Sequence, residues 1–511
     1  MTGRMAGRIR GARLGCALGL GVSLFGSVAA RGANNPEDQV QRTFEKTLPL
    51  TGNQGLSLEN RFGNVRITGG GGHDVKIVAT IRVQGKSKEE AQEFADKIQI
   101  DVQQASDGVH VKTIYPDDHA KYVLRIQWKK TSYSVDYDVA LPVDAPLWVR
   151  NDFGNVETAG LHGWVRIENG HGKIDVRDAG QTKITNAFGG ITLNNANGSS
   201  TIVNNNGNIE LSNVKGSVDV KNRFGNITAS QLSGDTTISG GNGNIEVSSV
   251  TGSMTVTNAF GNVTAKNING NLKVHDANAK VEAYDVTGNA DLATSFGELN
   301  AERIGGTLQV QDNNGQVVAR EIRGAATIQT SFGRIEAYQI HNSANLVTGN
   351  GNIDASGIDG NLFAKTSFGS LDLKNVKGNL TAQDSNGAVT ASGISGDAQV
   401  NTSFGGVTLS GIGGKVRVDN QNGAIEVTSE PANSCRDISL KTSFSHVIVR
   451  IPSGGGYRVN ARTSFGKISS ELPITSTGTI GSDVLNGTIG NGACSLELAN
   501  TNGGVEIAKS R

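Results

Sequence analysis

A Phe-Gly pair recurs at a fixed interval of 36 residues through the middle of this 511-residue chain. An Asn-Gly pair falls midway between successive Phe-Gly pairs, so a turn signal returns every 18 residues. The repeated residues are Phe188, Phe224, Phe260, Phe296, Phe332, Phe368 and Phe404, and Asn206, Asn242, Asn314, Asn350, Asn386 and Asn422, with Asn278-Ala279 in the one variant position. A fixed interval is typical of a repeat architecture, in which each unit buries its apolar side chains against its neighbours.

Each 18-residue unit contains two short segments in which apolar and polar residues alternate. Alternation over so few residues predicts short strands with one buried face. Glycine tolerates positive φ and asparagine tolerates the left-handed conformation, so the repeated pairs predict turns. The apolar residues of one unit follow one another at intervals of 2, 3, 4 and 2, and the next unit begins 7 residues later: Val263, Ala265, Ile268, Leu272 and Val274. No helical run separates the strands, which excludes a βαβ architecture.

The fold that satisfies this pattern is an all-β parallel β-solenoid, or β-helix, with 18-residue coils and a 36-residue double repeat. Stacked coils place equivalent apolar residues over one another, and each strand pairs in parallel with its equivalents above and below. We expect a right-handed coil, the usual hand of parallel crossovers. Between Gly154 and Gly423 there are 15 coil steps, which at about 4.7–4.9 Å each predict a rod of about 70–75 Å. An antiparallel sandwich would not keep a constant 18-residue register.

The N-terminus has the layout of a secretory signal peptide. Arg4, Arg8 and Arg10 precede an apolar stretch, 14–28, which ends in small residues suited to cleavage. The stretch is short for a membrane span, so an uncleaved anchor is the less favoured reading. We therefore expect an exported protein of the periplasm, the outer surface or the extracellular space, with no transmembrane segment after signal cleavage.

The flanks of the repeat predict the domain organisation. Ser87 and Glu90 form a capping box ahead of an apolar stripe, which predicts one short α-helix near 87–99. A solenoid must cover its open sheet edges, so this helix-bearing segment is expected to be an N-terminal cap. The predicted divisions are a signal peptide (1–30), a linker (31–42), a β-rich cap (43–150), a regular solenoid (151–429), and irregular coils with a C-terminal cap (430–511).

Cys435 and Cys494 are the cysteines left after signal cleavage. An oxidising compartment favours a disulfide between them. They are 59 residues apart, about three coils, and ideal stacking would separate them by more than the ~5.5–6 Å that a disulfide requires between Cα atoms. Both lie in irregular insertions that could bring them together, so a disulfide and two free buried thiols both remain open.

Charge and composition exclude several kinds of site. Lys plus Arg and Asp plus Glu number 47 each, and zero net charge gives no reason to expect a nucleic-acid partner. The eight His are scattered, and no metal, cofactor or phosphate-binding motif is present. Asp276, Asp312 and Asp384 share one column with Asn204 and Asn420, but lie at least two coils apart, so we interpret them as solvated corner residues. The uniform coil length leaves no long loop for a catalytic cleft, so we predict that the protein is not an enzyme.

The Phe column, Phe188 through Phe404, is the candidate binding site. Its rings could form a ladder that stacks on sugars or on apolar groups of a partner. They could instead fill a corner of the coil and bury their own surface. Alternation with Asn at the same position favours a corner over the deep core.

The Thr-Ser-Phe-Gly-x-[IVL] runs and Asn-Gly-x-[IV] half-units, behind a signal peptide and a helix-bearing segment, resemble the bacterial DUF4097 family of adhesin-like β-strand repeat proteins. The pattern is also similar to the head-GIN auto-transporter adhesins. The resemblance covers roughly 45–507 and implies an adhesin-like role without catalytic residues.

The resulting hypothesis is a structural, adhesin-like protein of the bacterial cell envelope that presents a repetitive surface to glycans or to envelope and surface proteins. A polysaccharide-active lyase or hydrolase, and a self-associating envelope scaffold, are the alternatives.

Overall fold

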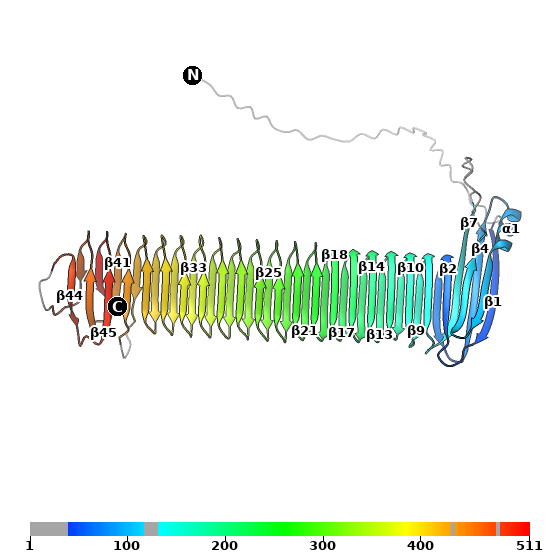
Figure 1. Ribbon diagram of the computed structural model, residues 1–511, viewed down its shortest axis with the longest axis horizontal. Helices are drawn as coiled ribbons and strands as arrows, with labels where there is room; N and C mark the ends of the chain where they lie inside the picture. Colours follow the sequence, from blue (N-terminus) through cyan, green and yellow to red (C-terminus); the bar gives the residue numbers. More distant parts are fainter. Residues whose placement is uncertain (1–38, 117–130, 431–434, 477–480, 511) are drawn as a thin grey trace, which may run out of the picture.

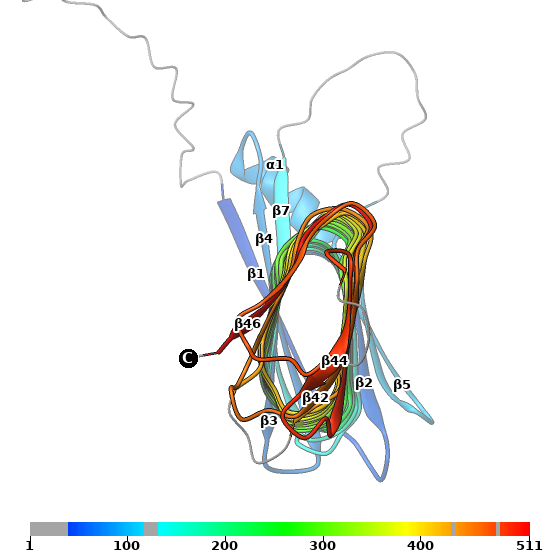
Figure 2. The same cartoon turned by 90° about the vertical axis from the view of Figure 1, so that its left-hand side faces the viewer.

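The protein is a long rod made of stacked coils, as the computed structural model shows (Figure 1). The structure describes residues 39–116, 131–430, 435–476 and 481–510; the predicted signal peptide and most of the predicted linker lie outside them. Each coil contributes one strand to each of two parallel sheets, and seen end-on the coils superpose in an elongated outline whose two long sides are these sheets (Figure 2). About 17 consecutive coils run from β8–β9 to β40–β41.

The strands of the regular coils alternate between the two sheets, which are named here by strand number. The even sheet contains β8 (Leu147–Phe153), β10 (Val165–His171), β12 (Thr182–Phe188), β14 (Ser200–Asn206), β16 (Val218–Phe224), β18 (Thr236–Asn242), β20 (Met254–Asn258), β22 (Leu272–Asp276), β24 (Ala290–Ala293), β26 (Leu308–Gln311), β28 (Ala326–Thr330), β30 (Ala344–Thr348), β32 (Leu362–Lys365), β34 (Leu380–Gln383), β36 (Ala398–Thr402), β38 (Val416–Asn420) and β40 (Ile438–Lys441). The odd sheet contains β9 (Val156–Leu161), β11 (Ile174–Ala179), β13 (Ile191–Asn197), β15 (Ile209–Lys215), β17 (Ile227–Ser233), β19 (Ile245–Thr251), β21 (Val263–Asn269), β23 (Val281–Val286), β25 (Leu299–Ile304), β27 (Val317–Ile322), β29 (Ile335–Ile340), β31 (Ile353–Ile358), β33 (Leu371–Val376), β35 (Val389–Ile394), β37 (Val407–Ile412), β39 (Ile425–Thr428) and β41 (Val447–Ile451).

Equivalent residues, most of them apolar, stack over one another from coil to coil, which confirms the predicted parallel β-solenoid. In the odd sheet Val263 pairs with Val281 and Ala265 with Ala283, and in the even sheet Val274 pairs with Leu292. The apolar positions of the repeat line the interior and are almost completely buried. Because side chains alternate between the two faces of a strand, the residues between them face solvent.

A kink in each odd strand explains why the second apolar interval is 3 residues rather than 2. One residue before the third apolar position adopts the left-handed conformation, as at Arg303 (φ 57°), Glu321 (φ 54°) and Gln339 (φ 58°). This conformation rotates the strand, so that two consecutive residues face outward and the next one points inward. Asn, Asp, Ser or Gly occupies most of the equivalent positions, and Gly and Asn adopt this conformation most readily.

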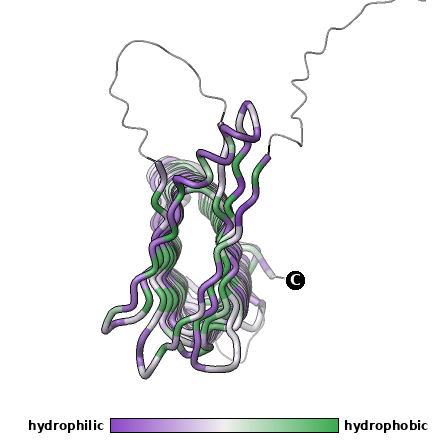
Figure 3. The backbone as a smooth tube through the Cα atoms, turned by 90° about the vertical axis from the view of Figure 1, so that its right-hand side faces the viewer, coloured by the Kyte–Doolittle hydropathy of each residue, from purple (hydrophilic) through white to green (hydrophobic). Residues whose placement is uncertain are grey.

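The N-terminal cap extends both sheets beyond the regular coils. The odd sheet continues from β9 through β3 (Val65–Gly70), β7 (Ser132–Pro142) and β4 (Asp74–Gln84) to β1 (Gln39–Pro49). The even sheet continues from β8 through β2 (Gly55–Phe62) and β6 (Gly108–Ile114) to β5 (Gln99–Ala105). The predicted linker therefore ends earlier than position 42, because β1 already begins at Gln39. Hydrophobic and hydrophilic residues alternate along these strands (Figure 3).

A single short helix, α1 (Lys88–Lys97), is present in the described part of the chain, as predicted for the cap. Ser87 is its N-cap, and its hydroxyl accepts a hydrogen bond from the Glu90 amide. Ala91 and Ala95 are buried, and the helix packs against β1 and β4. The carboxylate of Glu90 accepts a hydrogen bond from the Lys86 amide, one residue before the position expected for a capping box.

The C-terminal cap departs from the order of the sequence. The coil of β45 (Cys494–Ala499) and β46 (Val505–Lys509) lies between the last regular coil and the coil of β42 (Tyr457–Arg462) and β43 (Ile468–Ser470). A further strand, β44 (Val484–Ile489), pairs antiparallel with β42 at the outer edge. The N-terminal cap has the same arrangement, since β2–β3 lies between the β6–β7 coil and the regular coils. The first and last coils of the chain are therefore each covered by another coil.

Candidate binding edge

One long edge of the rod carries the repeated Phe residues, and all of them are exposed. The exposed fraction ranges from 42% at Phe224 to 78% at Phe465. Each Phe lies where an even strand passes into the following odd strand, and all but Phe444, which precedes Ser445, stand directly before the repeated Gly. At Gly225 the backbone has φ +120°, and a Cβ would lie 2.4 Å from the Gly207 oxygen of the preceding coil, so the turn requires glycine.

Phe and Asn alternate along this edge in space, including in the C-terminal cap. Phe188 pairs with Asn206, and Asn206 with Phe224. Beyond Phe404 the intervals in sequence become irregular, yet the inserted coil restores the alternation, because Asn502 lies between Phe444 and Phe465. We name this row the Phe edge. Its members are Phe188, Phe224, Phe260, Phe296, Phe332, Phe368, Phe404, Phe444 and Phe465, with Asn206, Asn242, Asn278, Asn314, Asn350, Asn386, Asn422 and Asn502 between them.

At the N-terminal end of this edge the rings form a continuous stack. Phe62 stacks on Phe153 with ring centroids 5.4 Å apart. His171 lies between Phe153 and Phe188, at 4.5 Å and 4.9 Å, with its plane within 9° of both. Aromatic rings on consecutive coils therefore stack face to face at about the spacing of the coils.

The turns that carry the Phe edge contain few charges. From Ala187 to Ala424 the residues that flank each Phe or Asn are small or polar and uncharged, except for four. These four have local partners: Lys280 and Glu298 form an ion pair at 3.4 Å, Arg334 binds Asp354 at 2.8 Å, and the Arg223 guanidinium lies over the Phe224 ring. The Phe edge is thus almost neutral, with exposed aromatic rings between Asn side chains.

A second column, two residues before each Phe or Asn of the edge, points into the rod. It is occupied almost throughout by Asn, Asp or Thr, and none of these residues is more than 7% exposed. Its members are Asn60, Asn151, Asn169, Asn186, Asn204, Asn222, Asn258, Asp276, Thr294, Asp312, Thr330, Thr348, Thr366, Asp384, Thr402, Asn420, Thr442, Thr463 and Asn500. The prediction that Asp276, Asp312 and Asp384 are solvated corner residues was wrong. The alternation of inward and outward side chains continues for one more step before the turn, so these three side chains point into the rod.

The column satisfies backbone groups of the turns, and it does so in two ways. In the N-terminal half, Asn204 donates from its side-chain nitrogen to the carbonyl oxygens of Gly189 and Gly207. In the C-terminal half the amide of the turn glycine points inward, and the Thr366 hydroxyl accepts from Gly369 while donating to the Gly351 oxygen. Buried backbone groups require such partners, so we assign this column a structural role.

The three buried aspartates differ from the Asn and Thr of this column because an ionised carboxylate has no hydrogen-bond donor. Asp312 accepts hydrogen bonds from the Gly315 amide and the Thr330 hydroxyl. Its second oxygen has no partner, and one oxygen of each of the other two aspartates, like those of several Asn in the column, is also unpartnered. Burial is the main cause that raises the pKa of Asp276, Asp312 and Asp384 above the usual value, because desolvation disfavours the charged carboxylate.

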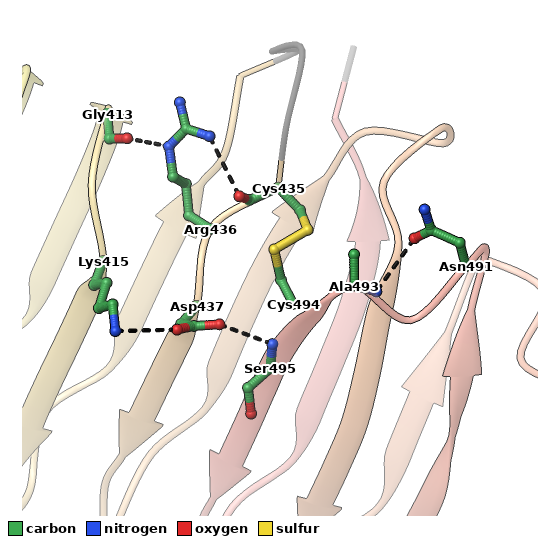
Figure 4. The surroundings of a disulfide bond; sticks show 9 residues. All are labelled: Gly413, Lys415, Cys435, Arg436, Asp437, Asn491, Ala493, Cys494 and Ser495. Atoms are coloured by element: carbon green, nitrogen blue, oxygen red, sulfur yellow. Dashed lines mark hydrogen bonds and ion pairs between the residues drawn. A yellow bond between two sulfur atoms is a disulfide. The ribbon is translucent and has the colours of Figure 1, made fainter.

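Cys435 and Cys494 form a disulfide with Cα atoms 5.9 Å apart (Figure 4). The disulfide is thus the one of the two open outcomes that the structure contains. The separation of three coils that ideal stacking would give does not arise, because β45 is inserted directly beside β40, and Ile438 pairs with Leu496. Asp437 supports the same junction. It accepts a hydrogen bond from the Ser495 amide and lies 3.4 Å from the Lys415 nitrogen.

No group of three or more His, Cys, Asp or Glu side chains able to hold a metal ion is found among the residues that the structure describes. Over the same residues, no helix has the length and apolar character needed to cross a membrane.

Neither a protein-family model nor a curated protein sequence matches this chain. A comparison with solved structures found a crystal structure described as a "putative cell adhesion protein" from Clostridium sporogenes. It has 12% sequence identity and a TM-score of 0.20, and the match covers 44% of this chain and 99% of that one. The predicted resemblance to the DUF4097 family has no support from a family model.

Proposed function

We propose that the protein is an exported, non-catalytic, adhesin-like β-solenoid of the bacterial cell envelope or surface, and that the Phe edge is the surface with which it binds. One observation carries the proposal: nine Phe side chains lie in a row on one edge, each at least 42% exposed. A packing role would bury these rings. A row of large apolar side chains exposed along one edge is the kind of surface that marks interaction sites.

The rod makes this surface multivalent. Nine equivalent rings recur at a constant spacing on one rigid body, so weak contacts at each ring add up when a partner carries a matching repeat. Glycans and envelope or surface proteins are the partner classes that the proposal names. The adhesin-like DUF4097 resemblance of the repeat agrees with it.

Export is supported by two features of the chain. The N-terminal pattern of basic and apolar residues is typical of a signal peptide. The Cys435–Cys494 disulfide is of a kind that forms and persists in oxidising compartments. Cell fractionation should therefore recover the protein outside the cytoplasm.

Binding by the Phe edge can be tested with the purified mature protein against glycan arrays and envelope fractions. A variant with Phe296→Asn, Phe332→Asn and Phe368→Asn keeps the residue that the edge already uses at alternate coils. We expect this variant to lose most of the binding while it melts like the wild type. Equal binding by both proteins would contradict the proposal, as would turnover of a polysaccharide that one Asp or Glu substitution abolishes.

A further inference from the structure

The Asn positions of the Phe edge form slots of defined width. Successive Phe residues are two coils apart, about 9.4–9.8 Å at the usual strand spacing. His171 shows what such a slot can hold, because its ring lies between Phe153 and Phe188 and stacks on both at 4.5 and 4.9 Å. From Asn206 onward the slots contain an Asn side chain instead of a ring. Each slot therefore has room for one flat ring from another molecule.

We infer that the occupant is a second copy of this chain, and that the Phe rings of two copies interdigitate along their Phe edges. Two copies have the same two-coil period by construction, so every ring of one meets a slot of the other once the first pair is in register. The inference rests on the proposed function, in which the Phe edge is the binding surface, and it names the partner that this edge binds.

The C-terminal cap gives independent support for this reading. There the chain inserts its last coil out of sequence order, and the intervals in sequence between Phe residues change to 40 and 21. The alternation nevertheless continues in space through Phe444, Asn502 and Phe465. If the fold required only a residue that can form a turn here, it would not need Asn502 between Phe444 and Phe465. The spacing is therefore a property of the surface and not of the repeat in sequence.

The size and chemistry of the Phe edge are those of a protein interface. With about 200 Å² per aromatic side chain and an exposed fraction near 60% over the nine rings, the Phe residues alone offer roughly 1,000 Å² per copy. A stable interface buries about 800 Å² per partner. Interface cores are rich in aromatic residues and poor in charge, as the Phe edge is.

Symmetry determines how the two rods lie. A twofold axis parallel to the rod would place each Phe opposite its own equivalent, and the rings would collide. A twofold axis perpendicular to the rod reverses one copy and lets its rings enter the slots of the other. The closed pair is therefore antiparallel, with each residue contacting its counterpart at a mirrored height along the edge.

Sedimentation of the purified mature protein over a range of concentrations tests the inference through paired variants. Phe296→Asn with Phe332→Asn and Phe368→Asn removes three rings, and we expect dimerisation to weaken more than tenfold. Asn206→Phe with Asn242→Phe and Asn350→Phe fills three slots from within the chain, as His171 does. We expect a loss of at least the same size, although this variant exposes more aromatic surface. Trp164→Ser, which removes an exposed ring outside the Phe edge, should change nothing.

Each alternative predicts a different result. Non-specific apolar association would strengthen when the slots are filled, and that outcome overturns the inference. A wild-type protein that stays monomeric up to its solubility limit also overturns it. If that monomer still bound a glycan or an envelope fraction, the proposed function would survive and the self-association would not.

Spin labels at two exposed positions of the even sheet report the orientation. Gln329 lies on the coil of Phe332, the middle ring of the nine, and Lys183 lies on the coil of Phe188 at one end. In an antiparallel pair with each ring in a slot, the two Gln329 labels lie one coil apart along the rod, about 5 Å, while the two Lys183 labels are separated by about 70–83 Å, from the strand spacing. Short Lys183 distances would exclude the antiparallel arrangement.

Discussion

The donor and acceptor atoms of a single side chain determine how well that residue suits the buried polar column. The Asn420 side chain makes two hydrogen bonds to the backbone of the turns. Its oxygen accepts from the Gly423 amide, and its nitrogen donates to the Gly405 oxygen. Asp312 has the same backbone surroundings but can only accept when ionised. One of its oxygens is buried without a partner, which costs about 1–3 kcal/mol. The column therefore tolerates Asp as an imperfect substitute for Asn.

Asp312→Asn should stabilise the protein at neutral pH by about 1–3 kcal/mol, since the amide restores the missing donor. The direction of the pKa shift gives the pH dependence. Because the pKa of Asp312 is raised in the folded state, the folded chain binds the proton more tightly, and the destabilising effect of the ionised carboxylate is absent below the usual pKa near 3.9. This destabilising effect grows as the pH rises through the raised pKa of Asp312.

The difference in melting temperature between Asp312→Asn and the wild type should therefore be largest near pH 7 and should disappear near pH 4. Asp235→Asn serves as the control, because Asp235 is exposed and its oxygen accepts the Ser253 amide, as an Asn oxygen would. A stabilisation that did not change with pH would show that the charge of Asp312 is not the cause.

The left-handed residues of the odd strands allow a second test. Gln339 has φ 58°, a conformation that β-branched residues strongly disfavour. Gln339→Val should destabilise the protein by roughly 1–2 kcal/mol, whereas Gln339→Gly, the residue found at the equivalent position 357, should be close to neutral. Gln329→Val in β28, an exposed position of a regular strand, should be neutral or stabilising. Thermal melts of the three variants compare them directly.

At the scale of elements, the sequence predicts the regular coils well and the caps poorly. The spacing of Val263, Ala265 and Ile268 is enough to give the strands, because each coil repeats the same local pattern. The interior column was missed because Asp276 directly precedes a turn and looks like a turn residue. Its interval of 2 from Val274 was the available signal. The left-handed positions were missed because Arg303 and Glu321 are not residues that favour this conformation.

The caps could not be predicted because their strand order differs from the order of the sequence. A local pattern shows where a strand lies but not which neighbour it pairs with, and β45 pairs with β40 across 58 residues of chain, as Ile438 with Leu496. For this reason the sequence left a disulfide between Cys435 and Cys494 open and could not decide it: sequential stacking would keep them apart, and the inserted coil brings them together. The sequence also could not show whether the Phe column is exposed, since the side chain of a corner residue can point outward into solvent or inward.

The disulfide should hold the inserted coil in place. Closing a loop of 59 residues lowers the entropy of the unfolded segment by an amount that corresponds to about 4 kcal/mol. In a Cys435→Ser, Cys494→Ser variant we expect faster hydrogen exchange in β42, β45 and β46 and no change in β10–β38, because coils of a solenoid interact only with their neighbours. Faster exchange along the whole rod would show that the cap controls the stability of the entire molecule.

The whole molecule behaves as a one-dimensional stack, and its length should be adjustable in whole coils. Deleting residues 334–369 joins Gly333 to Ser370 at equivalent positions of the repeat, so β33 replaces β29 and the Phe–Asn alternation is kept. We expect this 36-residue deletion to melt within a few degrees of the wild type, since stability is nearly a sum of terms between neighbouring coils. Small-angle scattering should show a rod shorter by about 9.4–9.8 Å.

The matched control deletes half a coil, residues 334–342, and joins Gly333 to Ser343. A strand of the even sheet, β30, then follows where a strand of the odd sheet is needed. Every later strand would have to pair across the wrong sheet, so the apolar residues could no longer stack in register. We expect this variant to aggregate or to lose its cooperative melt, even though it removes only a quarter as many residues. If it melted like the 36-residue deletion, the 18-residue coil would not be the unit that holds the rod together.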